Sequence, residues 1–197
     1  SSRINWKLIS IEGTEINGQG PEILEEEAEV FLQKMKYLQK EDILFLSGSI
    51  PASLPSDYYE KIMEHVKVNG VSVILDTNGE GLMRGLSHKP FLIKPNHHEL
   101  AATVGHELHT MEDIRAAAQS FVERGVRHVV VSLGKDGALY VGEDGCLYAP
   151  EIPVTVKSTV GAGDALVGGL LYGLVKHGNM REGFRAGAAA GTASVMT

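Results

Sequence analysis

The sequence predicts an α/β protein with a three-layer α/β/α architecture, and two observations carry this prediction. Short apolar runs typical of buried strands alternate with longer segments in which apolar residues recur at helical spacing. Such strand–helix units follow one another from residue 43 to residue 132, and consecutive units of this kind require parallel strands joined by crossover helices. The length of 197 residues, with 43% hydrophobic and 22% charged residues, is enough for one sizeable core.

The chain is expected to open with two short strands, residues 4–9 and 14–16, joined by a turn at Glu12 and Gly13. Residues 18–21 interrupt the pattern, and residues 22–40 then predict a helix with its acidic residues concentrated at the start. The interruption divides the chain into a small β segment, residues 1–20, and an α/β body, residues 21–197.

The body begins with residues 43–47, a nearly continuous apolar run typical of a strand buried on both faces. The expected elements that follow are helix 57–68, strand 71–75, short helix 80–86, strand 91–93, helical segment 99–104, helix 112–124 and strand 129–132. Residues 138–141 and 146–149 flank a Gly-rich turn and predict a hairpin. Two helices, residues 164–176 and residue 181 onward, complete the expected set.

Charge and composition argue against several classes of partner. Acidic residues number 25 and basic residues 18, for a net charge of −7, so nucleic acid is not expected to be the main ligand. No apolar run approaches the roughly 18 residues of a membrane span, and the first residues show no signal-peptide pattern. The single cysteine, Cys146, excludes an internal disulfide framework and fits a reducing, cytoplasmic location.

The strongest candidate site is the segment STVGAGD at residues 158–164, which precedes an apolar helical run. Ligands of open parallel sheets bind beyond the carboxyl ends of the strands, and small residues at a helix start leave backbone amides exposed to an anion. Asp164, in the first turn, is placed to accept a proton from a substrate hydroxyl. The alternative is that Gly163 allows close packing and Asp164 merely caps the helix.

A second candidate, KPNHHE at residues 94–99, follows the expected strand 91–93. Lys94 at a strand end is placed to meet a phosphate. Asn96 and Glu99, three residues apart, would share a helical face and could hold Mg²⁺ through water. The alternative is a capping box in which Asn96 caps the helix and Glu99 completes the pair.

Two weaker candidates also follow strands. The segment SLGKDG at residues 132–137 offers a glycine turn with a basic side chain, and it lacks the spacing of a P-loop. The segment SGSIP at residues 47–51 offers two hydroxyl groups for a sugar or a phosphate. Each is equally consistent with a plain turn. The histidines at residues 97, 98, 106 and 109 lack the spacing that places two histidine ligands on one helix face, so no histidine metal site is expected.

Taken in order, SGSIP, KPNHHEL, SLGKDGAL and TVGAGD resemble the motifs of the ribokinase/PfkB family of carbohydrate kinases, and they span most of the chain. The opening RINWKL and TEINGQGP resemble the lid region of the branch that contains 1-phosphofructokinase and tagatose-6-phosphate kinase. The resemblance implies a ribokinase-like, Rossmann-like sheet with a small β lid. It also implies that the N-terminal part of the family fold and a C-terminal helix are missing, so that the α/β body is incomplete at both ends.

The implied reaction is ATP-dependent phosphorylation of the 6-hydroxyl of fructose 1-phosphate, giving fructose 1,6-bisphosphate and ADP. Tagatose-6-phosphate kinase, a kinase for another sugar or a nucleoside, and a non-catalytic nucleotide-binding fragment remain as alternatives. The implied cofactors are ATP and Mg²⁺, the implied partner is a small sugar phosphate, and the lid implies a homodimer.

The resemblance also assigns roles to individual residues. It implies that Asp164 is the catalytic base and that Gly161, Ala162 and Gly163 form the anion hole. Matches to other family positions imply that Asn96 and Glu99 organise Mg²⁺. They imply a nucleotide site formed by Lys94, Ser132, Gly134 and Thr159. They also imply that Arg3 and Ser49 bind the sugar phosphate.

Overall fold

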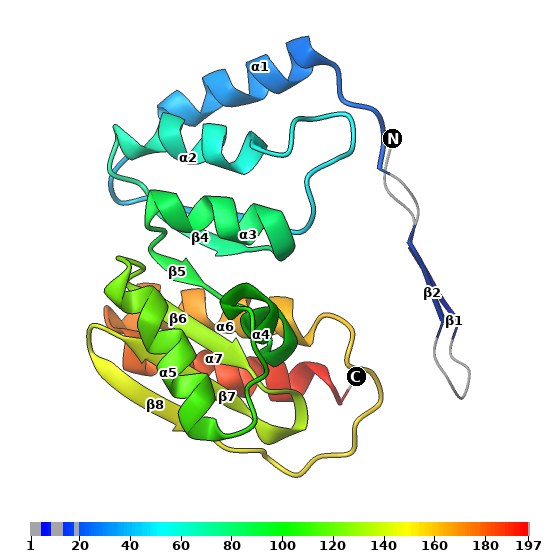
Figure 1. The fold of residues 1–197 in the computed structure, drawn as a ribbon, viewed down its shortest axis with the longest axis vertical. Helices are drawn as coiled ribbons and strands as arrows, with labels where there is room; N and C mark the ends of the chain where they lie inside the picture. The colour runs from blue at the N-terminus through cyan, green and yellow to red at the C-terminus, as the bar shows by residue number, and fades with distance from the viewer. Residues whose placement is uncertain (1–4, 9–13, 18–19, 197) are drawn as a thin grey trace.

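The computed structural model describes residues 5–8, 14–17 and 20–196. Strands β1 (Asn5–Leu8) and β2 (Thr14–Asn17) pair antiparallel, with Asn5 opposite Asn17, and form a two-stranded sheet. Figure 1 shows this sheet lying apart from the main sheet. The predicted strand pair is confirmed, whereas the predicted turn at Glu12 and Gly13 lies outside the described residues.

The main sheet has six strands in chain order, β3 to β8. Their bounds are Ile43–Ser47 (β3), Ser72–Asp76 (β4), Leu92–Ile93 (β5), His128–Ser132 (β6), Ala138–Gly142 (β7) and Gly145–Ala149 (β8). Strands β3 to β6 pair in parallel, and β7 and β8 add an antiparallel hairpin. The predicted mostly parallel sheet and the predicted hairpin are therefore both confirmed.

Helices cover both faces of this sheet, which gives the predicted three layers (Figure 1). The bounds are Glu25–Lys34 (α1), Tyr58–Lys67 (α2), Gly79–Gly85 (α3), His97–Val104 (α4), Met111–Glu123 (α5), Ala162–His177 (α6) and Met180–Ser194 (α7). Alternate strand residues face opposite layers because side chains alternate across a strand. In β4, Val73 and Leu75 pack with helices α1 to α5, whereas Ile74 packs with α6 and α7.

Strand β3 departs from its prediction. Within it only Leu46 is buried, and Phe45 on the other face is 36% exposed. Among the described strands β3 is paired only with β4, and α6 and α7 pack mainly against residues of β4 to β7. The prediction that β3 is buried on both faces is wrong, because an apolar run does not reveal which face a distant helix covers.

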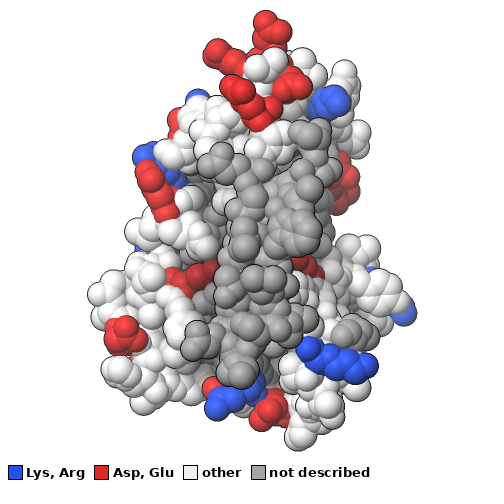
Figure 2. All heavy atoms as spheres, turned by 90° about the vertical axis from the view of Figure 1, so that its right-hand side faces the viewer, with Lys and Arg blue, Asp and Glu red and all other residues white. Residues whose placement is uncertain are grey.

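Helix α1 is shorter than predicted, beginning at Glu25 and ending at Lys34 before the short 3₁₀ helix Met35–Tyr37. The Glu27 carboxylate accepts a hydrogen bond from the Leu24 amide at 3.0 Å, which fixes the start of the helix. The glutamates of the first turn are exposed, and Figure 2 shows acidic side chains gathered over this end of the molecule. They form a solvated face that interacts favourably with the positive helix terminus.

Helices α6 and α7 approach each other closely because glycines face the contact. A Cβ atom built on Gly169 would lie 2.6 Å from both the Ala186 carbonyl oxygen and the Ala190 Cβ. A Cβ on Gly187 would lie 2.7 Å from the Leu166 carbonyl oxygen. This packing fixes α6, whose first turn carries the candidate anion hole.

Two neighbouring glycines of α6 provide a matched test of that packing. Gly169→Ala is expected to destabilise the fold by about 2 kcal/mol, because the added methyl group collides with backbone that cannot move alone. Gly168→Ala is expected to stabilise it by up to about 1 kcal/mol, since that position is exposed and its new Cβ meets nothing within 4 Å. Urea unfolding of both variants measures the difference, and equal stabilities would contradict the packing account.

No helix in the part of the chain that the structure describes is both long and apolar enough to span a membrane.

Candidate active site

Two buried polar side chains stand out in the described core, and they lie at opposite ends of the sheet. His128, the first residue of β6, is 4% exposed, and its Nδ1 lies 3.0 Å from the Tyr140 hydroxyl. Burial, and secondarily the charge of Arg127, lower the pKa of His128 and favour a neutral ring. This pair is satisfied within the core. Lys94, 8% exposed, instead follows β5 at the carboxyl edge, where ligands of parallel sheets bind.

Lys94 is held by an acidic residue on the neighbouring strand. Its Nζ lies 3.2 Å from Oδ1 of Asp76, the last residue of β4, whose side chain is 15% exposed. The parallel register pairs Leu75 with Ile93, so the residues that follow them emerge side by side at the same edge. The ion pair therefore follows directly from strand register.

The start of α6 lies against the same ammonium group. Gly161, the N-cap residue, takes a left-handed conformation with φ +79° and has no side chain with which to cap the helix. The first amides of a helix have no intrahelical partner, so this terminus is open to an anion. A Cβ built on Gly163 would lie 3.2 Å from Lys94 Nζ, which places the ammonium beside the helix start. The predicted anion hole and the predicted phosphate-binding lysine are thus brought together.

Further carboxylates converge on this point. Burial raises the pKa of the Asp76 carboxyl, the Lys94 charge opposes the rise, and the carboxylates of Glu99 and Asp164 add to it. Asp164 itself is exposed in the first turn of α6. Three carboxylates therefore influence one another here and one of them is paired with Lys94, a balance of charge that favours a further cation at this edge.

The oxygen donors fit Mg²⁺ held mainly by water and phosphate. Within the described ranges, no group of three histidine, cysteine or acidic side chains is arranged to hold a metal directly. Mg²⁺ typically keeps several waters and takes one or two protein carboxylates together with substrate phosphates. The site is therefore consistent with a metal that arrives with a nucleotide.

Asn96 and Glu99 form the capping box that the sequence left as an alternative. Asn96 Oδ1 accepts from the Glu99 amide at 2.9 Å, and Glu99 Oε2 accepts from the Asn96 amide at 2.8 Å. The cap starts α4 at His97, two residues before the predicted helical segment. The charge of the Glu99 carboxylate held in this cap contributes to the raised pKa of Asp76.

The other predicted nucleotide-binding residues lie on loops that begin at or near this edge. Ser132 ends β6, donates its amide to the Pro95 carbonyl at 3.1 Å and bridges to Asn96. Gly134, with φ +61°, opens the 3₁₀ turn Gly134–Asp136, and a Cβ there would meet open space. Thr159 is exposed, and its carbonyl accepts from the Ala162 amide at 3.4 Å.

Of the two predicted sugar-phosphate-binding residues, Ser49 and Arg3, the structure describes Ser49. Ser49 follows β3 and lines a hollow of about 290 Å³ together with Thr77, Asn78 and Glu80, which follow β4. This hollow opens at the sheet edge that carries Asp76. Arg3 lies outside the described residues.

Asp76 and Thr77 are two residues of this edge that the sequence pattern does not predict. The expected strand ends at Leu75, one residue before the strand end in the structure. The available signal was an aspartate directly after a buried apolar run, at the carboxyl end of a parallel strand.

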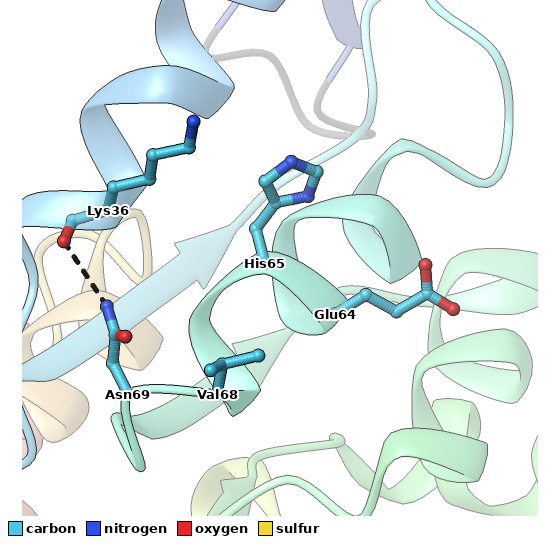
Figure 3. A pocket seen from close by; sticks show the side chains of 5 residues that line it. All are labelled: Lys36, Glu64, His65, Val68 and Asn69. Carbon is cyan, nitrogen blue, oxygen red and sulfur yellow. Dashed lines mark hydrogen bonds between the residues drawn. The ribbon is translucent and has the colours of Figure 1, made fainter.

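A larger hollow of about 430 Å³ lies between the 3₁₀ helix Met35–Tyr37 and the end of α2 (Figure 3). These elements lead into β3 and β4, so the hollow is at the amino edge of the sheet, opposite the candidate site. Figure 3 shows the Glu64 carboxylate and the Lys36 ammonium pointing away from one another. The two charged side chains of this hollow therefore do not converge on a common point.

An α/β/α fold with an anion site at this edge is typical of proteins that bind phosphorylated ligands. The chain belongs to the pfkB family of carbohydrate kinases, whose sequence model matches residues 1–197. The resemblance drawn from the motifs is thereby confirmed.

Individual relatives agree with this assignment. The 1-phosphofructokinase of Bacillus subtilis (strain 168) is 42% identical over 196 residues, which cover 100% of this chain and 65% of the relative. The 1-phosphofructokinase of Escherichia coli (strain K12) is 39% identical over 184 residues, covering 92% of this chain and 58% of the relative. The chain thus spans less than two thirds of the length of these relatives.

A solved structure confirms the ribokinase-like fold. Phosphofructokinase-2 from Escherichia coli, in complex with substrates and products, superimposes with a TM-score of 0.89 at 33% identity. The match covers 98% of this chain and 64% of that one.

Proposed function

We propose that the full-length protein is an ATP-dependent sugar-phosphate kinase that phosphorylates the 6-hydroxyl of fructose 1-phosphate. The observation that carries this proposal is the convergence of Lys94, the start of α6 with its N-cap Gly161, and Asp164 at one sheet edge. Phosphoryl transfer requires positioning and charge stabilisation of this kind rather than covalent chemistry. The relatives named 1-phosphofructokinase support the choice of sugar.

In the proposed reaction the 6-hydroxyl oxygen forms a bond to the γ-phosphorus as the bond to the bridging oxygen of ADP breaks. The hydroxyl proton passes to the Asp164 carboxylate, and fructose 1,6-bisphosphate and ADP leave. The backbone amides of Gly161, Ala162 and Gly163 stabilise the charge on the phosphoryl group during transfer. The open N-terminus of α6 supports this role.

Lys94 is proposed to bind the nucleotide phosphates, with Asp76 fixing its ammonium group. Ser132, Gly134 and Thr159 are proposed to line the nucleotide site. Asn96 and Glu99 are proposed to hold waters of Mg²⁺, which when bound neutralises phosphate charge. The capping box supports this arrangement because it fixes the Glu99 carboxylate, whose charge raises the pKa of Asp76.

An ADP-release assay on the full-length protein with Mg-ATP tests the substrate. We expect kcat/KM to be highest for fructose 1-phosphate, compared with tagatose 6-phosphate and fructose 6-phosphate. A higher kcat/KM for tagatose 6-phosphate would show that the protein is a tagatose-6-phosphate kinase instead. ATP binding without turnover of any sugar would indicate a non-catalytic nucleotide-binding protein and contradict the proposal.

We also propose that the protein is a cytoplasmic homodimer in which the two-stranded sheet makes the contact. A two-stranded sheet is marginally stable by itself, and pairing with a second copy would bury it. Sedimentation of the full-length protein is expected to give a dimer. Replacing residues 5–17 by a Gly–Ser linker is expected to give a monomer, and an unchanged dimer would place the contact elsewhere.

A further inference from the structure

We infer that Tyr59 and Thr77 are positioning residues for the sugar phosphate, because their hydroxyl groups fix the turn that carries Ser49. This inference rests on the proposed function, since it concerns the sugar subsite of that reaction. It adds to the site two residues that do not belong to any of the motifs found in the sequence.

The turn is centred on Gly48, directly after β3. The Gly48 carbonyl oxygen accepts hydrogen bonds from the Thr77 hydroxyl at 2.9 Å and from the Tyr59 hydroxyl at 3.1 Å. The Gly48 amide donates to the Asp76 carbonyl oxygen at 3.0 Å. Both backbone polar groups of Gly48 are therefore held, by Tyr59 of α2, by Asp76 at the end of β4 and by Thr77, which follows it.

Hydrogen bonds rather than packing define this turn. Gly48 has φ +85°, a conformation that residues with a side chain rarely adopt, and a Cβ there would meet nothing within 4 Å. Residues 47–49 are all exposed. The Tyr59 and Thr77 hydroxyls both donate to the Gly48 carbonyl oxygen, so removing either hydroxyl removes one of the hydrogen bonds that hold the turn in place.

The same contacts connect the turn to the ion-pair site. The Tyr59 hydroxyl also lies 2.9 Å from the Ser47 carbonyl oxygen, so its single proton is shared between the carbonyls of two successive residues. Burial raises the pKa of Tyr59, and the nearby Asp76 carboxylate adds to the rise, which keeps the hydroxyl protonated as a donor. The geometry places Ser49 at a fixed position relative to Asp76, and hence relative to Lys94.

The turn also forms part of a ligand-sized space. Ser49 and Thr77 both line the hollow of about 290 Å³ that opens at this edge. Its lining combines hydroxyl and amide groups with a short apolar wall, and its one carboxylate, that of Glu80, is paired with Arg84, which suits a polar sugar ligand. A shift of the Gly48 turn would move one wall of this space while leaving the α6 terminus in place.

The test compares Tyr59→Phe and Thr77→Val with the matched control Tyr58→Phe in the full-length protein. Tyr58 precedes Tyr59 on α2 and also donates its hydroxyl to a backbone carbonyl, that of Ala28 at 2.8 Å. We expect each test variant to raise KM for fructose 1-phosphate about five-fold, with KM for ATP changed less than two-fold. Tyr58→Phe is expected to leave both constants unchanged, and Thr77→Ser, which keeps the hydroxyl, to retain the wild-type KM.

Hydrogen exchange supplies a readout that does not depend on activity. The peptide containing residues 47–50 is expected to exchange faster in Tyr59→Phe and Thr77→Val than in Tyr58→Phe. Unchanged exchange, an unchanged sugar KM, or equal rises in both KM values would overturn the inference. A wild-type protein that phosphorylates no sugar would instead refute the proposed function, and the exchange measurement would still decide whether the hydroxyls fix the turn.

Discussion

Replacing Asp164 by Asn in the full-length protein is expected to lower kcat at least about a hundredfold. The amide has nearly the same shape as the carboxylate but cannot accept the hydroxyl proton. ATP binding should be unchanged or tighter, because the substitution removes a negative charge beside the phosphate site. The measurements are kcat from ADP release and Kd for ATP from calorimetry.

Glu182→Gln is the matched control for this variant. Glu182 also lies in the first turn of a helix, α7, and its loss costs a similar interaction with the helix dipole. It is expected to keep kcat within about two-fold of wild type. If Asp164→Asn behaves like Glu182→Gln, Asp164 is only a favourable charge at a helix start.

Lys94→Met is expected to destabilise the fold by about 3 kcal/mol and to raise KM for ATP at least tenfold. The substitution leaves the Asp76 carboxylate without its ion-pair partner and still under the negative charges of Glu99 and Asp164. Urea unfolding measures the first effect, and steady-state kinetics measure the second.

The double variant Lys94→Met/Asp76→Asn separates structure from function. Removing the unpaired carboxylate is expected to recover at least half of the lost stability, because the penalty comes from that uncompensated charge. KM for ATP should not recover, since the ammonium is still absent. Recovery of both would show that Lys94 acts only as the partner of Asp76.

The sequence pattern predicts the residues of the site to the extent that it locates the ends of the strands. Lys94 and the segment 161–164 are far apart in sequence, yet each follows or precedes an element whose type the apolar pattern indicates. The rule that ligands gather at the carboxyl edge then predicts that they meet. Asp76 was not predicted, because applying this rule requires knowing which residue ends the strand. The boundaries of an element are what periodicity locates least well.

Other features depend on tertiary contacts that a sequence pattern does not encode. The burial of β3 depends on which strands α6 and α7 cover. The tight contact at Gly169 depends on the angle and distance between two helices. The spacing of Asn96 and Glu99 suits both a capping box and a metal-water site, and the structure shows that the cap forms.

The central claim is that this site transfers a phosphoryl group from ATP to a sugar rather than to water. Phosphorus NMR of the full-length protein with Mg-ATP and fructose 1-phosphate tests it most directly. We expect a new phosphate ester on the 6-oxygen, formed in equal amount to ADP and reduced to trace in Asp164→Asn. Formation of ADP with inorganic phosphate alone, or an Asp164→Asn variant that makes the ester at the wild-type rate, would contradict it.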